Sequence, residues 1–450
     1  MSLIASNLAS LDGLSEKYSV EALADALKPA WVEEALRHRD RVGERRRRLP
    51  GDFTLWAVVL LGVFRRESYV NVLFKLRESL WALRNWGTDE APPTSSAFSQ
   101  ARDRLGVGPV KQVYEVSAQA WTEETRGVRI AGLRVMGIDG STARTPDSVA
   151  NRAHFGLPGA SRGRAAYPSM RLLTLFDIGS RITVAMRHGP YATGEMTLAR
   201  AIVPAVPKDA LIVLDRYFLG YEFLHDLRQR GAHFIVRVKR NTRAKVVKRL
   251  GRGDAIVRVH LHPALRRRRP DLPETMLLRE VIYCPKKGHE AIRVFTSLTD
   301  PVLASAGEIA IGYGLRWQHE VGFDEIKTHL SERTTTNRAV LFRSLDPTRV
   351  EQELYGIFVA HNLVRVLIHR AGSRADVDPR RLSFVAGLER IREAIQAMMV
   401  LPTPRLIERY ERLLKAIALV RVPLRPGRSN PREVKIKVSS YPCKKTRRAA

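Results

Sequence analysis

The chain has 450 residues, and 76 Lys and Arg residues against 46 Asp and Glu residues give a formal net charge of +30. Such a surplus indicates a polyanionic partner, first of all nucleic acid, and argues against a membrane-surface protein, because basic residues occur in every third of the chain. We expect no signal peptide, and Cys284 and Cys443 cannot build a disulfide framework or a zinc cage, so a reducing cytoplasm is expected.

The first 128 residues predict an all-helical domain. Ser19 is placed to cap a helix that runs to Asp40 with a break at Pro29, and a basic run from Arg45 to Arg48 follows. The longest apolar run, Leu55 to Phe64, is about half a bilayer span. It therefore predicts a core helix and not a transmembrane one.

A short helix carries two arginines of this domain. Thr94 or Ser95 caps it, Gly106 ends it, and Arg102 and Arg104 lie between. Exposed arginines on a helix pair with a Gly-containing turn are typical of a DNA-reading module. A solvated basic face on a helical bundle explains the same pattern equally well.

After residue 128 the apolar pattern changes from helical spacing to alternation. A buried strand is predicted to end at Asp139, followed by a hairpin from Met170 to Gly189, a helix from Thr197 to Val203, and a strand from Leu211 to Leu214 that leads into Asp215. This is the element order of a ribonuclease-H-like α/β sheet. The first strand of such a sheet lies centrally and the fourth pairs beside it in parallel, so the two aspartates should be neighbours.

The 104 residues between Asp215 and Glu320 are too many for a simple connection. Short β-rich segments in residues 233–296 predict an inserted β domain. One of its loops carries a run that is either a grip on DNA or a solvated patch: Arg266, Arg267, Arg268 and Arg269. His260, His262 and Cys284 fit no usual zinc pattern.

The stretch from Tyr313 to Lys327 predicts a helix with a polar stripe. Tyr313, Arg316, Glu320 and Lys327 are separated by three, four and seven positions, which keeps them on one side of a regular helix. Alone, a Glu flanked by Arg and Lys is more often a surface salt-bridge ladder. Together with two strand-end aspartates it predicts three converging carboxylates, whose repulsion divalent cations would offset.

The C-terminal part predicts an amphipathic helix from Asp346 to Arg370, beneath the site, because its apolar residues recur at helical spacing. Further helices are predicted from Arg380 to Met399 and from Thr403 to Leu419. A Pro-rich basic tail after Arg421 should be extended. We therefore divide the chain into four parts. Residues 1–128 form a helical DNA-binding domain, and residues 129–232 with 297–370 form a ribonuclease-H-like core. Residues 233–296 form a β-rich insertion, and residues 371–450 form a C-terminal helical region with its tail.

The chain resembles the DDE transposases of the insertion-sequence-four group. The signature of that group is Tyr, two residues, Arg, three residues, Glu, six residues, Lys, and it is matched at Tyr313, Arg316, Glu320 and Lys327. The likeness also includes the segments around the two aspartates, IDGSTARTPDSVANRAHFG and LDRYFLGYEFL. It extends from ARDRLG in the N-terminal part to NPREVKIK near the end, so nearly the whole chain is covered.

The resemblance implies a cut-and-paste enzyme that hydrolyses the ends of an insertion sequence and joins the 3′-hydroxyls to target DNA. Its catalytic and metal-binding positions, for two Mg²⁺ ions with Mn²⁺ as a substitute, fall on Asp139, Asp215 and Glu320. Its phosphate-binding positions fall on Tyr313, Arg316 and Lys327. It further implies a homodimer on double-stranded DNA at the bacterial nucleoid, and it leaves a hairpin intermediate open.

Arginines outside the signature are further candidate DNA contacts: Arg102, Arg104, Arg144, Arg266, Arg267, Arg268 and Arg269. Two other functions fit the sequence. A catalytically inactive relic would only bind end sequences, and a ribonuclease-H-like nuclease would cleave without strand transfer. Three retained, mutually repelling carboxylates favour the active enzyme over the relic, and the helical domain and the insertion speak against a simple nuclease.

Overall fold

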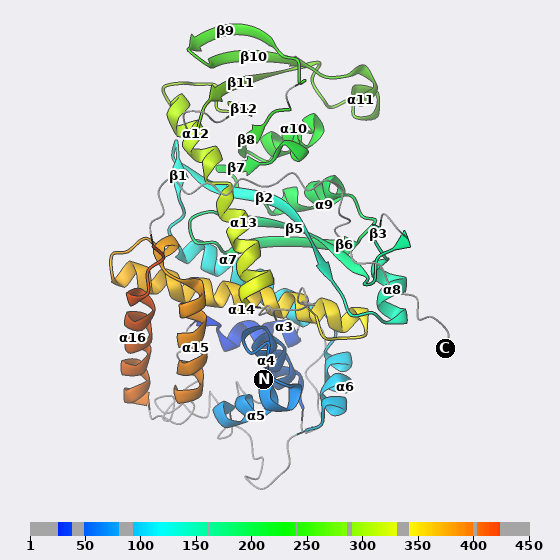
Figure 1. The fold of residues 1–450 in the computed structure, drawn as a ribbon, viewed down its shortest axis with the longest axis vertical. Helices are drawn as coiled ribbons and strands as arrows, with labels where there is room; N and C mark the ends of the chain where they lie inside the picture. Colours follow the sequence, from blue (N-terminus) through cyan, green and yellow to red (C-terminus); the bar gives the residue numbers. More distant parts are fainter. Residues whose placement is uncertain are drawn as a thin grey trace.

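The computed structural model describes residues 26–37, 49–80, 93–160, 163–239, 241–285, 290–330, 342–398 and 403–423. N-terminal helices, a ten-stranded mixed sheet and C-terminal helices follow one another along the chain (Figure 1). The predicted cap at Ser19, the run from Arg45 to Arg48 and the tail beyond residue 423 lie outside the described residues.

The apolar run that predicted a core helix lies in a buried helix of the N-terminal domain. The helices of this domain are α3 (Pro29–Arg37), α4 (Gly51–Val63), α5 (Tyr69–Leu80), α6 (Ser95–Leu105) and α7 (Gly108–Glu124). All residues of α4 from Asp52 to Val63 are buried. Of the two predicted caps of α6, Thr94 is the one used, since its Oγ1 accepts a hydrogen bond from Ala97 N at 3.2 Å, and Gly106 follows the helix as predicted. Within the described ranges no helix combines the length and apolar character of a membrane span.

The central sheet has the predicted ribonuclease-H-like order. Strand β2 (Leu133–Arg144) lies between β5 (Ser169–Asp177), which is antiparallel to it, and β7 (Ala210–Leu214), which is parallel. The hairpin partner of β5 is β6 (Thr183–Pro190), and β8 (His233–Arg237) runs parallel beside β7. Small elements complete this part: β1 (Arg129–Ile130), α8 (Val149–Phe155), β3 (Gly159–Ala160) and β4 (Gly163–Arg164).

Helices cover both faces of this sheet. On one face α9 (Glu195–Ile202) and α10 (Tyr221–Gln229) pack with even-numbered residues of β2 into an apolar core. On the other face α12 (Ala306–Gly314) packs with Val135. Because side chains alternate along a strand, Asp139 points to the face of α12 and of α13 (Trp317–Asp324), which run down the sheet in Figure 1.

The β-rich insertion extends the same sheet. It contains β9 (Lys245–Gly251), β10 (Asp254–His260), α11 (Pro263–Arg268), β11 (Thr275–Tyr283) and β12 (Ile292–Thr296). The strand order β6-β5-β2-β7-β8-β12-β11-β10-β9 has no break, since β12 pairs with β8. Residues 233–237, which the sequence assigned to the insertion, therefore form the fifth strand of the central sheet. The arginine run expected on a loop ends the short helix α11.

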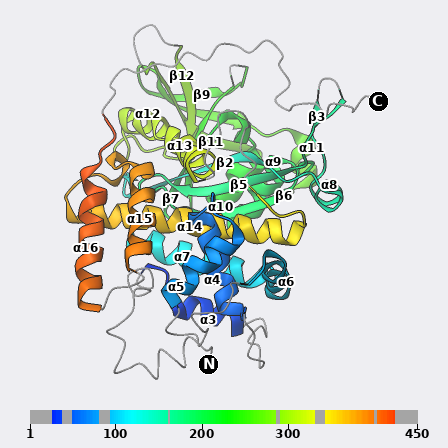
Figure 2. The same cartoon turned by 60° about the horizontal axis from the view of Figure 1, so that its bottom comes forward.

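The C-terminal helices are α14 (Pro347–Arg374), α15 (Phe384–Met398) and α16 (Thr403–Leu419). Asp346 caps α14, where its side chain accepts a hydrogen bond from Arg349 N at 3.1 Å. The prediction that this helix is amphipathic, with one exposed face, is wrong, because every residue from Gln352 to His369 is buried. Helices α4, α7, α15 and α16 all pack against it, as Figure 2 lets the reader follow. α14 is thus the axis around which the helical part is built.

Candidate active site at the sheet edge

Two aspartates meet where β2 and β7 run side by side. The two strands are parallel, with Ile138 opposite Leu214, so Asp139 and Asp215 follow at the next register position. Asp139 Oδ1 accepts a hydrogen bond from Gly140 N at 2.8 Å, and Asp215 Oδ1 accepts one from Tyr217 N at 3.2 Å. The predicted neighbourhood of the two aspartates is therefore present.

Helix α13 brings a third carboxylate and a guanidinium over this pair. Arg316 Nη2 donates to Glu320 Oε1 at 2.7 Å, and Arg316 Nη1 lies 4.0 Å from Asp139 Oδ2. All three side chains keep between 19% and 27% of their surface exposed. The site is thus open to a ligand, and Arg316 supplies positive charge between two of its carboxylates.

The signature residues do not lie on one regular helix, contrary to the sequence prediction. α12 ends at Gly314, α13 begins at Trp317, and the wider-turned segment η4 (Glu325–Leu330) follows. At the first junction Arg316 N donates to Tyr313 O at 3.1 Å, a tight turn next to two glycines of low helix propensity, Gly312 and Gly314.

The remaining two signature residues flank the carboxylates from opposite sides. Tyr313 is 6% exposed, and burial raises the pKa of its phenol, with a further contribution from Asp215. Lys327 Nζ donates to Thr142 O at 2.7 Å and to Ser141 Oγ. Burial lowers the pKa of Lys327 to about 8, against the opposing pull of Asp139, so the amine is a cation at neutral pH.

Burial has the largest effect on the charge of Asp139, and the other two carboxylates add to it. Burial raises the pKa of Asp139 to about 6, Asp215 and Glu320 push it upward, and Gly140 N and Arg316 oppose the rise. In the described part of the chain, no three His, Cys, Asp or Glu side chains stand close enough to hold a metal ion as they are. The donor set nevertheless fits Mg²⁺ or Mn²⁺, since both prefer carboxylate oxygens.

Asp139→Asn is expected to stabilise the protein at pH 8. The folded state keeps the Asp139 proton up to about pH 6, whereas the unfolded chain loses it near pH 4. The free energy of unfolding therefore declines as pH rises from about 4 to about 6, and above pH 6 the full cost of burying the charged carboxylate remains. Removing the charge should recover about 2–3 kcal/mol, seen as a rise in Tm at pH 8 that shrinks towards pH 4. A lower Tm at pH 8 would mean that the ionised Asp139 carboxylate does not destabilise the folded state.

His319, which the sequence analysis did not single out, seats α13 on the sheet. It is 1% exposed, its Nε2 lies 2.7 Å from Thr174 Oγ1, and its ring stacks on Phe176 with centroids 4.8 Å apart. Gly137 makes room for it, since a Cβ there would stand 2.7 Å from the histidine Nδ1. A glycine inside a strand pattern marks such a close approach, so Gly137 was the available signal.

Arg237 was also missed. β8 pairs with β7 so that Val236 lies opposite Leu214, and the next position puts Arg237 beside Asp215. Its charge opposes the rise in the pKa of both Tyr313 and Tyr283. The residue was overlooked because its strand was assigned to the insertion.

Among the other predicted DNA contacts, the prediction for Arg102 is wrong, because its side chain is buried. It is 0% exposed, where its Nε donates to Gln352 Oε1 at 3.0 Å and its Nη1 lies 3.5 Å from Glu353 Oε1. The arginine pattern of α6 was read as exposed, yet this residue faces α14. Arg104 is exposed and Arg144 half-buried.

In the insertion, the arginines on α11 differ from the one that follows them. Arg266, Arg267 and Arg268 are exposed. Arg269 donates to Asp226 at 2.8 Å and to Asp271 at 2.7 Å. The first three are therefore better placed for an external anion than the fourth.

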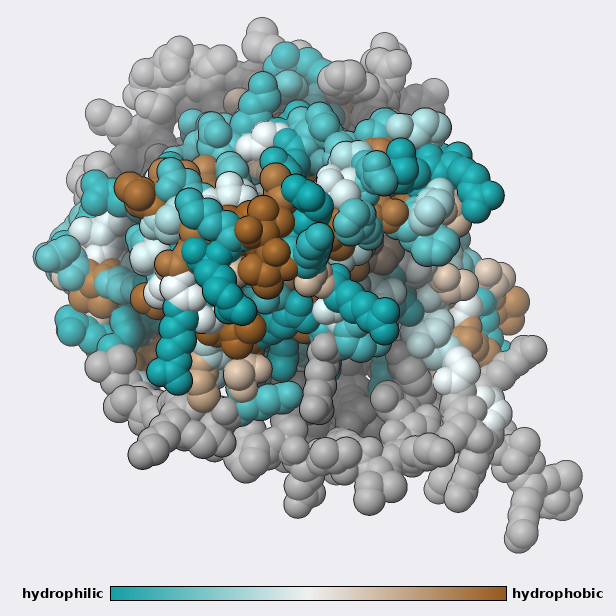
Figure 3. Space-filling view, turned by 90° about the horizontal axis from the view of Figure 1, so that it is seen from above, coloured by the Kyte–Doolittle hydropathy of each residue, from teal (hydrophilic) through white to brown (hydrophobic). Residues whose placement is uncertain are grey.

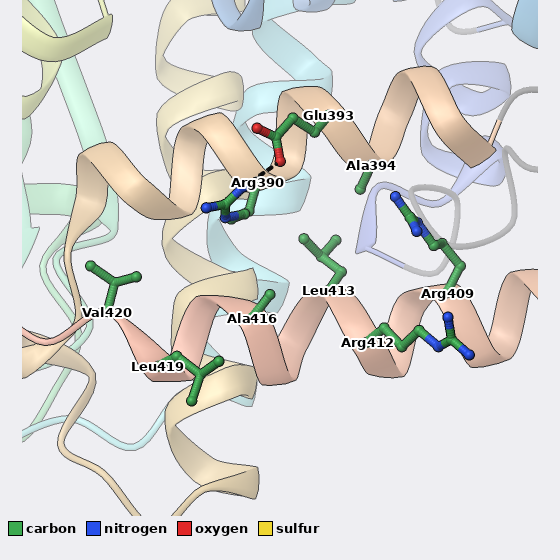
Figure 4. A pocket seen from close by; sticks show the side chains of 9 residues that line it. All are labelled: Arg390, Glu393, Ala394, Arg409, Arg412, Leu413, Ala416, Leu419 and Val420. Atoms are coloured by element: carbon green, nitrogen blue, oxygen red, sulfur yellow. Dashed lines mark hydrogen bonds and ion pairs between the residues drawn. The ribbon is translucent and has the colours of Figure 1, made fainter.

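A groove of about 350 Å³ opens between α15 and α16 (Figure 4). Its lining carries Arg390, Arg409 and Arg412 beside apolar side chains, and one carboxylate, Glu393, which accepts a hydrogen bond from Arg390 at 2.7 Å. Without a histidine, a cysteine or a second carboxylate, this lining offers no acid–base or metal chemistry. The groove is therefore a weaker candidate for an active site than the sheet edge.

Comparison with known proteins places this chain among transposases. Residues 131–363 match the family described as Transposase DDE domain, and residues 17–115 match Insertion element 4 transposase N-terminal. Transposase InsG for insertion sequence element IS4, from Escherichia coli (strain K12), is 29% identical over 424 residues, which cover 94% of this chain and 93% of that protein.

Two further likenesses are weaker or partial. Putative transposase InsZ of the same organism is 30% identical over 233 residues, covering 51% of this chain and 75% of that protein. A piggyBac transposase synaptic complex with hairpin DNA aligns with a TM-score of 0.41 and 14% identity over 92% of this chain and 87% of that chain, and adds nothing to the assignment. The family matches confirm the resemblance, and the chain belongs to the DDE transposases of the IS4 group.

Proposed function

We propose that this DNA transposase is catalytically active and that Asp139, Asp215 and Glu320 hold two divalent cations, Mg²⁺ or Mn²⁺. The observation that carries the proposal is that two neighbouring parallel strands end at Asp139 and Asp215, while Arg316 lies 4.0 Å from Asp139 and pairs with Glu320 of α13 at 2.7 Å. When bound, such ions supply charge stabilisation and an activated nucleophile for phosphoryl transfer.

The basic and phenolic groups of the site are suited to a DNA phosphate. The guanidinium of Arg316 donates to one oxygen of Glu320, and a DNA phosphate would offer it a bidentate partner. Lys327 contributes a compact cation and Tyr313 a neutral donor. Arg237 adds a further cation beside Asp215.

The reaction we propose has two displacements at phosphorus. Water first opens a phosphodiester at each end of the element and leaves a 3′-hydroxyl there. That oxygen then attacks a phosphodiester of target DNA, and the displaced target 3′-oxygen takes up a proton. We place this reaction on paired ends held by a homodimer, in the cytoplasm at the bacterial nucleoid.

Exposed basic groups offer contacts to the duplex on either side of the site. The edge strand β9 presents Lys245, Lys248 and Arg249, and α11 presents its three arginines. Figure 3 looks down on this end of the molecule, whose surface is largely hydrophilic. Arg104 on α6 is the exposed candidate of the N-terminal domain. Neutralised phosphates release counterions, so binding should weaken steeply with salt.

Labelled linear DNA that carries the element's ends tests the proposal. Binding in both Mg²⁺ and Ca²⁺ with cleavage and joining in Mg²⁺ alone supports the active transposase. Binding without cleavage in either ion would support the relic. Cleavage without joining of the 3′-ends would support a nuclease.

Arg316→Ala is expected to weaken both assembly of the protein–DNA complex and turnover, by about 10- to 100-fold in total, because a charged hydrogen bond to phosphate is lost. Gel shift and single-turnover cleavage measure the two effects. Arg412→Ala is the matched control, since Arg412 also pairs with a glutamate four residues away, but at an exposed position of α16. If Arg316→Ala behaves like the wild type, Arg316 does not bind DNA and its pair with Glu320 is an ordinary surface salt bridge.

A further inference from the structure

The segment after Glu320 is anchored by a buried carboxylate that the catalytic proposal does not use. Glu325 is the first residue of η4 and is 3% exposed. Its Oε2 accepts a hydrogen bond from Arg365 Nε at 2.8 Å, and Arg365 Nη2 donates to its Oε1. Its Oε2 also lies 3.2 Å from His361 Nε2. Glu325 thus ties η4 to the central helix α14.

A second arginine ties the same carboxylate to the sheet. Arg181, in the turn between β5 and β6, donates from Nη1 to Glu325 Oε1 at 2.9 Å. Its Nε and Nη2 donate to Gln318 Oε1 at 3.0 and 2.6 Å. One buried guanidinium therefore grips the chain on both sides of Glu320, two residues before it and five residues after it.

The two elements that carry these arginines, α14 and the β5–β6 turn, are hydrogen-bonded to one another. Asn362, next to His361 on α14, accepts a hydrogen bond from Thr183 N at 2.9 Å and donates one to Thr183 O at 3.0 Å. Thr183 is the first residue of β6 and follows the turn that holds Arg181. α14 and the β5–β6 turn therefore cannot shift relative to one another without breaking this pair.

Stability alone is a weak reason for such a cluster. Taking two guanidinium groups and a carboxylate out of water is costly, and apolar packing of similar volume often stabilises a fold as well. Buried, fully bonded ionic groups instead impose one geometry, since each bond has a narrow range of distance and angle. Here the imposed geometry is that of the helix carrying Glu320 and of the turn carrying Lys327.

We propose that Glu325, with Arg181 and Arg365, is a positioning residue of the active site. The cluster sets where the Glu320 carboxylate stands over Asp139 and Asp215. It also sets the reach of Lys327, two residues beyond Glu325. The inference rests on the proposed function, because it assigns the geometry of the same three carboxylates.

Glu325→Gln tests the inference against Glu353→Gln. Glu353 is the matched control because it is also a buried carboxylate between two buried arginines, Arg65 and Arg102, but does not contact α13 or η4. Both variants should lose stability. Only Glu325→Gln should bind Mn²⁺ about tenfold or more weakly, measured by electron paramagnetic resonance on the protein bound to end DNA. Cleavage within preformed complexes, well below Tm, should fall by a similar factor.

Equal Mn²⁺ affinity and equal cleavage in the two variants would overturn the inference. If Glu325→Gln does not fold, Gln318→Met decides, because it removes the other acceptor of Arg181 and leaves the Glu325 cluster paired. It should slow cleavage about tenfold, and a wild-type rate would overturn the inference. A wild-type protein that binds Mn²⁺ but never cleaves would refute the proposed function, while the Mn²⁺ comparison would still test the positioning role.

Discussion

Glu320→Gln is expected to slow cleavage of end DNA by about a thousandfold or more while the DNA stays bound. Removing the charge of one of three converging carboxylates should forfeit several kcal/mol of transition-state stabilisation, and each 1.36 kcal/mol is tenfold in rate. The amide keeps the size of the side chain and an oxygen for Arg316, so the fold should be retained. Single-turnover cleavage in Mg²⁺ and a gel shift measure the two properties.

Asp324→Asn is the matched control on the same helix. Its carboxylate is exposed, accepts a hydrogen bond from Thr328 Oγ1 at 2.6 Å and lies 3.3 Å from His329 Nε2, two side chains that the proposed site does not use. It should cleave like the wild type. Full cleavage by Glu320→Gln would remove Glu320 from the triad, and an equal loss in both variants would point to general damage to the helix.

Arg102→Met is expected to destabilise the protein by about 3–5 kcal/mol, because it leaves Glu353 buried with one of its two cationic partners removed. Any loss of DNA binding should then follow from unfolding. Urea denaturation and a gel shift at low temperature measure the two properties.

Arg104→Met is the control for that variant, because Arg104 is exposed on the same helix and should change stability by no more than about 0.5 kcal/mol. If Arg102→Met kept full stability but lost DNA binding, the original prediction of a direct DNA contact would stand and the structural role would fail.

The strands and the aspartate pair could be predicted because their signals are local. A compact apolar segment running into an aspartate marks a strand end, and the chirality and order of connections then place two such ends together. Helix spacing likewise brought Arg316 and Glu320 into contact. These inferences needed no knowledge of distant partners.

What failed depends on contacts between remote parts of the chain. Nothing in α6 distinguishes Arg102 from Arg104 until Gln352 and Glu353 are known to lie opposite the first of them. The strand that ends in Arg237 has the same composition as the insertion strands, and only its parallel partner β7 identifies it. Glu325 gave no signal because its role depends on Arg181 and Arg365, which come from two other elements.

The unbroken sheet also acts as a ruler. From β7, which delivers Asp215, to the basic edge strand β9 there are five hydrogen-bonded steps, a span of roughly 24 Å at the usual spacing of neighbouring strands. That span equals about seven base pairs of a B-form duplex at 3.4 Å each. Because each strand between β7 and β9 is hydrogen-bonded to the next, a duplex gripped at the outer edge would meet the proposed cleavage site at a set number of base pairs from that grip.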